Sequence, residues 1–119
     1  MDNKDLSDRR KYPRTPLDLE IEIRQLLSED QQAVEDTQLC KCRDIGGGGL
    51  SFYSMHSYSL QSVLRLHIPL DGFHIKVMGK VMWRKKLPAA PDYVTGVQFL
   101  NIYEHDLNTL CSYVAKRCL

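Results

Sequence analysis

The stretch LDLEIEIR, residues 17–24, alternates apolar and charged side chains without a break. Its leucines and isoleucines occupy the odd positions, and the even positions hold Asp18, Glu20, Glu22 and Arg24. Successive side chains of a β-strand point to opposite faces, so this period of two predicts a strand with one buried face. A sheet therefore begins here, and the remaining segments indicate how it closes.

Five further segments show a strand-like pattern of apolar residues. One of them ends at Pro69 and the Asp71-Gly72 pair, which is typical of a turn. The other connections are also short and contain no helical pattern, which favours an antiparallel sheet closed or nearly closed into a barrel. Trp83 shares the parity of the apolar residues on its strand and is expected in the barrel core, with a platform for base stacking as the alternative. The segments lie at about residues 33–43, 50–54, 63–68, 73–83 and 93–100.

The end of the chain changes to helical spacing. Apolar side chains recur there at intervals of three and four residues, which predicts one helix over residues 103–118. The predicted fold is therefore mainly β: a six-stranded antiparallel barrel over residues 17–100 with one C-terminal α-helix. Residues 9–16 form a flexible basic arm, and residues 1–8 a tail expected to be disordered. The apolar positions of the helix are Leu107, Leu110, Cys111, Val114, Ala115 and Cys118.

Charge and hydropathy exclude several classes of protein. The chain carries 16 Lys and Arg against 15 Asp and Glu, so a net charge of +1 gives no bulk attraction to nucleic acid or to a membrane. No apolar run approaches the roughly 18–20 residues of a membrane span, and the start lacks the apolar stretch of a signal peptide. We therefore expect a cytoplasmic protein without membrane insertion. A nucleic-acid-binding barrel stays an alternative, but the acidic face of residues 17–24 argues against it.

The four cysteines are Cys40, Cys42, Cys111 and Cys118. Cys40 and Cys42 would share one face of a strand, so a metal or redox site is conceivable, but no histidine has zinc-ligand spacing to them. A free cysteine behaves as a small buried hydrophobe, and we expect structural core residues. The sequence also lacks a P-loop, G-x-S-x-G, H-E-x-x-H and C-x-x-C. We therefore expect neither a metal, a cofactor nor an enzyme.

Residues 9–14 read RRKYPR and contain an R-x-x-x-R pattern formed by Arg10 and Arg14. Guanidinium groups present forked donors that match phosphate oxygens, and they also stack on flat bases. On an extended segment, two such groups can grip separate parts of one ligand. Arg9 and Lys11 flank the pair and add candidate phosphate contacts. The alternative is a solvated basic tail.

Residues 44–49 read DIGGGG, with an aspartate followed by a run of four glycines. The Asp44 carboxylate can accept two parallel hydrogen bonds, and the Watson–Crick edge of guanine offers two adjacent N–H donors. A glycine run suits a backbone with positive φ or the close approach of another group. The alternative is a loose hairpin turn. Arg43, next to Asp44, either contacts a ligand or points outward.

In combination, these features resemble the PilZ domain family, bacterial receptors for cyclic di-GMP. Arg10 and Arg14 match the arginines of the family's R-x-x-x-R motif, and Asp44 and Gly49 match the ends of its [D/N]-x-S-x-x-G motif. The stretches GKVMWRKK and YVTGVQFLNI also look like the last two strands of the family. The resemblance covers about residues 9–119 and implies a split barrel.

One position departs from the family pattern, because Gly46 stands where the motif has a serine that helps to hold the guanine. Loss of one neutral hydrogen bond costs about 0.5–1.5 kcal/mol, so we expect weaker binding and not its abolition. The resemblance implies a ligand site that comprises Arg10, Arg14, Asp44, Gly46 and Gly49. The flanking candidates for the same site are Arg9, Lys11 and Arg43.

The resemblance further implies how the protein acts. Cyclic di-GMP, as one molecule or as a stacked pair, would order the N-terminal arm, and the reshaped surface would contact an unidentified effector protein. Motility and biofilm formation are the processes that family members control. The alternative is a degenerate PilZ adaptor that acts through protein contacts without binding nucleotide.

Overall fold

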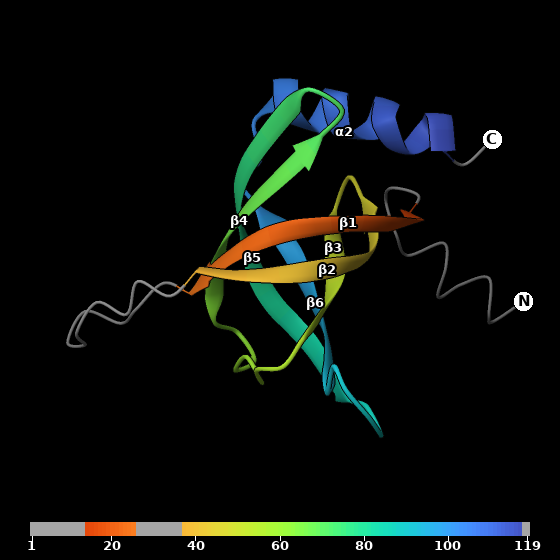
Figure 1. Ribbon diagram of the computed structural model, residues 1–119. Helices are drawn as coiled ribbons and strands as arrows, with labels where there is room; N and C mark the ends of the chain where they lie inside the picture. Colours follow the sequence, from red (N-terminus) through yellow and green to blue (C-terminus); the bar gives the residue numbers. More distant parts are fainter. Residues whose placement is uncertain (1–13, 26–36, 118–119) are drawn as a thin grey trace, which may run out of the picture.

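The computed structural model describes residues 14–25 and 37–117, and it confirms the predicted fold class (Figure 1). The predicted tail at 1–8, residues 9–13 of the predicted arm, and residues 33–36 of the second segment lie outside the described residues. Arg14 and the two residues after it, assigned above to the arm, belong to the first strand. The elements are β1 (Arg14–Gln25), β2 (Thr37–Gly46), β3 (Gly49–Ser54), β4 (Val63–Leu70), β5 (Phe73–Lys86), β6 (Tyr93–Leu100) and α2 (Glu104–Arg117).

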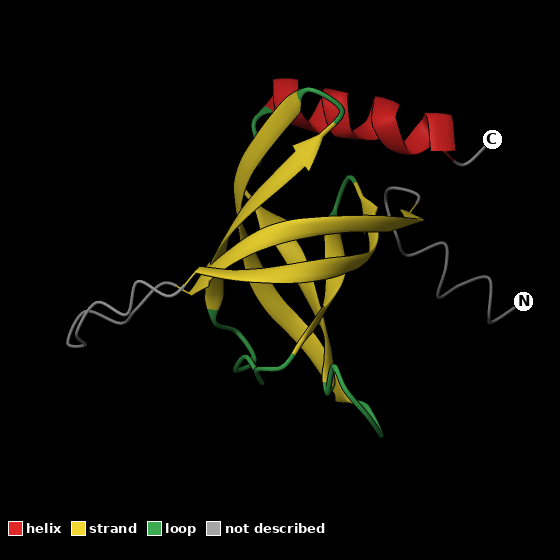
Figure 2. Cartoon of the chain, in the orientation of Figure 1, coloured by secondary structure: helices red, strands yellow, loops and turns green. Residues whose placement is uncertain are grey.

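The strands form a closed antiparallel barrel in the order β1-β2-β3-β6-β5-β4. β1 closes it by pairing with β2 on one side and with β4 on the other. In Figure 2 the helix α2 lies across one end of the barrel, beside the β4–β5 hairpin. The helix packs against β1 and β2, so the terminal element covers the end at which the β2–β3 turn also lies.

The barrel core follows the predicted alternation on most strands. In β1, Ile21 and Ile23 are fully buried, while Glu20 and Glu22 are exposed. Burial of such a side chain contributes about 1.5–3 kcal/mol, so the alternation itself specifies which face of each strand turns inward. The other large buried side chains of the strands include Ile45, Leu50, Phe52, Leu64, Leu66, Ile68, Leu70, Ile75 and Val81.

The helix buries a narrower face than its sequence predicts. Leu110 and Val114 are buried, Leu107 and Cys111 are only half-buried, and Ala115 is exposed. A helix that covers the end of a barrel meets it along a short line, so only the central positions of the apolar stripe are enclosed. None of the helical residues that the structure describes forms a segment long and apolar enough to cross a membrane.

Cys40 and Cys42 are core residues, as predicted. Burial raises the pKa of the Cys40 thiol to about 11. Burial, together with the nearby Asp44 carboxylate, raises the pKa of Cys42 to about 12. The Cys42 thiol also donates a hydrogen bond to the backbone oxygen of Asp44 at 3.4 Å. Both thiols therefore stay protonated at neutral pH, as expected of small apolar side chains in a core.

Candidate functional site

An irregularity in β2 brings two charged side chains to the outer face of the barrel. Cys42 and Ile45 are buried in the core, and regular alternation would place the two residues between them on opposite faces. The β2–β3 register instead shifts between Cys42 and Asp44, which is the signature of a β-bulge. Arg43 and Asp44 consequently lie side by side on the outside, where both contact the same neighbour on β3.

That neighbour is Ser51, and it links a four-residue polar network. The Ser51 hydroxyl donates to Asp44 Oδ1 at 2.7 Å and accepts from Arg43 Nε at 3.0 Å. Arg14 Nη1 donates to the same Asp44 oxygen at 3.3 Å, and Arg43 Nη2 lies 3.6 Å from Asp44 Oδ2. The side chains of Arg14 and Asp44 are only 19% and 20% exposed, so their ion pair is screened less than a surface pair.

A second bulge extends this network to an aromatic ring. The β5–β6 register shifts between Val81 and Trp83, so Trp83 leaves the inward parity of its strand. Its ring lies over Gly96 of β6, where a Cβ atom would overlap the indole. Gly96 is the register partner of Ser51, and the Arg43 guanidinium lies 5.6 Å from the centre of the Trp83 ring. The side chains thus form one continuous row across the outer face from β1 to β5.

The prediction that Trp83 lies in the barrel core was therefore wrong. Trp83 is 37% exposed, because the bulge after Val81 moves the following residues of β5 to the opposite face from the one that regular alternation predicts. An exposed ring beside a guanidinium offers a flat surface on which a planar ligand can stack. No local feature of the sequence marks the bulge, since a bulge is defined by the pairing of two strands.

The glycine run proves to be a tight connection between β2 and β3. Gly46 and Gly49 are paired strand residues, and only the two glycines between them form the turn. At Gly49 a Cβ atom would collide with the backbone oxygen of Val97 on β6. Among the described glycines, only Gly72 has a positive φ, of 89°. Close approach of two strands, and not a left-handed backbone, is the reason for glycine at position 49.

The structure brings most of the predicted site residues together. Arg14, Arg43 and Asp44 are in direct contact, and Gly46 lies opposite Arg14 in the β1–β2 register and opposite Gly49 in the hairpin. Arg9, Arg10 and Lys11 lie outside the described residues. The sequence interpretation missed Ser51. The available signal was a small polar residue between two inward-facing apolar residues on a predicted strand.

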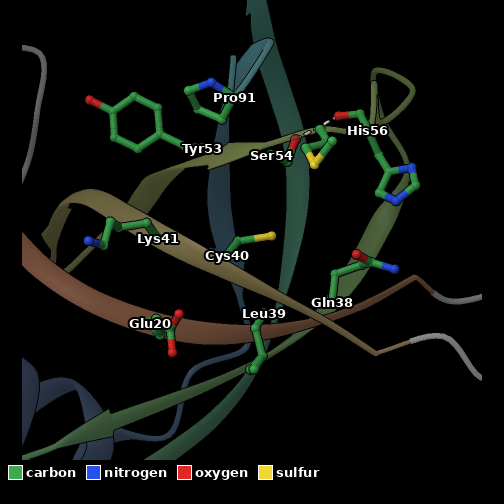
Figure 3. A pocket seen from close by; sticks show the side chains of 10 residues that line it. Glu20, Gln38, Leu39, Cys40, Lys41, Tyr53, Ser54, His56 and Pro91 are labelled. Carbon is green, nitrogen blue, oxygen red and sulfur yellow. Dashed lines mark hydrogen bonds between the residues drawn. The ribbon is translucent and has the colours of Figure 1, made fainter.

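A cavity of about 740 Å³ lies elsewhere on the barrel (Figure 3). It opens between the beginning of β2 and the end of β3, and none of the predicted site residues lines it. The Ser54 hydroxyl at its edge already donates to the backbone oxygen of His56 at 2.6 Å. Its residues are Glu20, Gln38, Leu39, Cys40, Lys41, Tyr53, Ser54, Met55, His56 and Pro91. Because it lacks the row of cations and carboxylate, we do not assign it as the candidate site.

Comparison with solved structures gives the same fold. The Bacillus subtilis inhibitor of motility (MotI/DgrA) is 22% identical with a TM-score of 0.77, and the match covers 92% of this chain and 51% of that one. The PilZ domain of Escherichia coli YcgR with c-di-GMP is 12% identical with a TM-score of 0.66, covering 92% and 91%. MrkH, a c-di-GMP-dependent transcription regulatory factor, is 15% identical with a TM-score of 0.65, covering 91% and 50%.

The chain therefore spans about half the length of MotI and of MrkH. No curated protein sequence matches it significantly. At these identities the solved structures show the fold alone. The family follows from the sequence itself, because a family model for the PilZ domain matches residues 8–116, which is nearly the whole chain. The chain belongs to the PilZ domain family.

Proposed function

We propose that this protein is a receptor for cyclic di-GMP and that the ligand binds along the row from Arg14 to Trp83. The observation that carries the proposal is the Arg14–Asp44 ion pair, which joins two sequence motifs 30 residues apart. Members of the PilZ family act as ligand-binding receptor domains. A contact between the two motif residues supports a single site that uses both.

Each group in the row has a suitable chemical task. The Arg14 and Arg43 guanidinium groups match the phosphate oxygens of the ligand. Asp44 Oδ2 accepts no hydrogen bond within 3.5 Å from a described residue, and it can receive the N–H donors of a guanine edge. The exposed face of Trp83 offers a surface for stacking. Gly46, opposite Arg14 in the β1–β2 register, lets the base approach the backbone, whereas Gly49 contributes by allowing β3 to lie close to β6. Arg9, Arg10 and Lys11 supply further phosphate contacts from the N-terminal side.

The proposed receptor acts by contact with a partner protein and not by catalysis. Ligand binding would order the residues before Arg14 against the barrel and so create a surface for an effector. The similarity to an inhibitor of motility supports motility as a controlled process, and biofilm formation and a cytoplasmic location stay part of the proposal. No cofactor is needed, because the ligand itself is the signal.

The test is titration of the full chain with cyclic di-GMP, followed by calorimetry and by the fluorescence of Trp83, the sole tryptophan. We expect saturable heat together with a change in fluorescence. Cyclic di-AMP is the matched control, because its adenine lacks the paired N–H donors for Asp44. The fitted stoichiometry distinguishes one bound molecule from a stacked pair. The proposal would be overturned if a high concentration of cyclic di-GMP produced no heat and no change in fluorescence. That result would favour an adaptor without nucleotide, consistent with Gly46 in place of the motif serine.

The substitution Ser51→Ala is expected to weaken cyclic di-GMP binding by about tenfold, because it removes a hydrogen bond to Asp44 and another from Arg43. Both groups would remain but would be less well oriented. Calorimetric titration measures the change. Ser54→Ala is the control, since Ser54 lies on the same strand and its hydroxyl, among the described residues, bonds to the His56 backbone oxygen and not to the candidate site. Equal affinities of the two variants would show that Ser51 does not position the site.

A further inference from the structure

The charges of the barrel are unevenly distributed. The neighbouring strands β4, β5 and β6 carry no Asp or Glu, although acidic and basic residues are nearly equal in number over the whole chain. The net charge of +1 therefore conceals a positive half of the barrel, balanced by an excess of acidic residues elsewhere. The basic residues of these strands are Arg65, Lys76, Lys80, Arg84, Lys85 and Lys86.

Met78 marks the centre of a compact arrangement on the outer face of this half. Lys76 and Lys80 lie two residues before and after it on β5, so all three side chains point to the same face. Arg65 of β4 and Leu100 of β6 are its direct register partners on either side. Directly opposed residues have Cβ atoms about 4.5–5.5 Å apart. Three cations and one leucine therefore frame a methionine that is 40% exposed.

A hollow of about 440 Å³ adjoins this arrangement. Its apolar lining includes Met78, Leu100 and Tyr103, and Tyr103 is 75% exposed. Arg65 and Lys76 line the same hollow. None of the three cations that frame Met78 forms an ion pair with another of the described residues. Positive charge beside an open apolar surface is thus left for a group from outside the described chain.

We propose that this surface, formed by Arg65, Lys76, Met78, Lys80 and Leu100 and here called the β5 basic face, docks an acidic segment of a partner protein. Carboxylates of the segment pair with the three cations, and an apolar side chain between them enters the hollow. Arginine and methionine are enriched in protein interfaces, and the flexible methionine side chain adapts to its contact. The inference rests on the proposed function only for the existence of a partner.

A protein segment fits this face better than other anionic surfaces. Amphipathic surfaces that bind lipid insert apolar groups into the bilayer boundary, whereas Met78 and Leu100 line a hollow that a bilayer would leave unfilled. A nucleic acid backbone presents phosphates and sugars, and these leave the apolar lining without a partner. Acidic peptides with one apolar residue satisfy both the charge and the hollow.

The experiment uses the full ¹⁵N-labelled chain and a short synthetic peptide with a central phenylalanine flanked by glutamates. We expect the peptide to shift the amide resonances of the β5 basic face selectively, and to do so less at high salt, because exposed charges are screened. The double variant K76E/K80E should bind the peptide about tenfold or more weakly. Its titration with cyclic di-GMP should match that of the unsubstituted chain, so failure of this inference is distinguishable from failure of the proposed function.

Matched controls decide the specificity. Lys41→Glu reverses an exposed strand lysine on β2, in the opposite half of the barrel, and should leave peptide binding unchanged. A peptide with glutamine in place of glutamate should cause no shifts at the face. The proposal is overturned if the acidic peptide shifts no resonance there, if K76E/K80E and Lys41→Glu behave alike, or if duplex DNA or phosphatidylserine vesicles bind this face more tightly than the peptide.

Discussion

The substitution Arg14→Ala is expected to weaken cyclic di-GMP binding by about a hundredfold. The proposed pair of charge-assisted hydrogen bonds from the Arg14 guanidinium to the ligand phosphate, of about 1.5 kcal/mol each, would be lost. Arg14 is the only residue of the R-x-x-x-R pair within the described residues, and its side chain also contacts Asp44 Oδ1 at 3.3 Å. Its removal would take away a ligand contact and also the positive charge that orients the carboxylate. Calorimetric titration at fixed salt measures the loss.

The matched control is Arg24→Ala, which removes the same side chain from the other end of the same strand. The Arg24 guanidinium donates to the Thr37 hydroxyl at 3.1 Å, far along β1 from the candidate site. We expect this variant to bind cyclic di-GMP as the unsubstituted chain does. If both variants bind equally well, the row of side chains is not the ligand site. The double variant R10A/R14A should bind more weakly than Arg14→Ala if the first arginine acts at the same site.

The second large effect concerns stability. Gly49→Ala is expected to lower the free energy of unfolding by about 3 kcal/mol, because the new methyl group would collide with the backbone oxygen of Val97. The colliding atom belongs to the β6 backbone, so a side-chain rotation does not relieve the clash. Urea denaturation followed by far-UV circular dichroism measures the change, and the slope of the transition shows whether the unfolding stays two-state.

Gly72→Ala provides the contrast for this prediction. At Gly72 nothing lies within 4 Å of an added Cβ atom, but the backbone has a φ of +89°. The expected cost is about 1–2 kcal/mol, from the left-handed conformation alone. A Gly49→Ala variant that is as stable as the unsubstituted chain would contradict the close approach of β3 and β6. A larger loss for Gly72→Ala would show that backbone conformation matters more than space in this barrel.

Several features of the fold could be predicted because they depend on neighbouring residues in the sequence. Ile21 and Ile23 alternate with charged residues, and this pattern alone identifies a strand with a buried face. Cys40 and Cys42 follow the same rule and are buried as expected. The helix was predicted from its spacing, but the extent of its buried face depends on the small area of barrel that it meets.

Of the candidate site, only the residues that belong to the two sequence motifs could be predicted. Arg14 and Asp44 stand out by their types and order, whereas Ser51 is an ordinary serine until β3 is paired beside β2. Trp83 was assigned to the wrong face because parity was extended through a bulge. The β5 basic face was likewise hidden, since a net charge of +1 says nothing about which strands are neighbours.

By itself, the sequence determined which segments are strands, which face of most of them is buried, and which two motifs carry candidate ligand-binding groups. These properties follow from the order of side chains within one segment. Successive side chains of a strand point to opposite faces, and burial of the apolar face is favourable. Only the tertiary structure decided where the bulges of β2 and β5 lie, and therefore that Arg43, Ser51 and Trp83 meet in one row. The physical reason is that register and bulges are set by hydrogen bonds between strands distant in sequence, so no single segment contains the information.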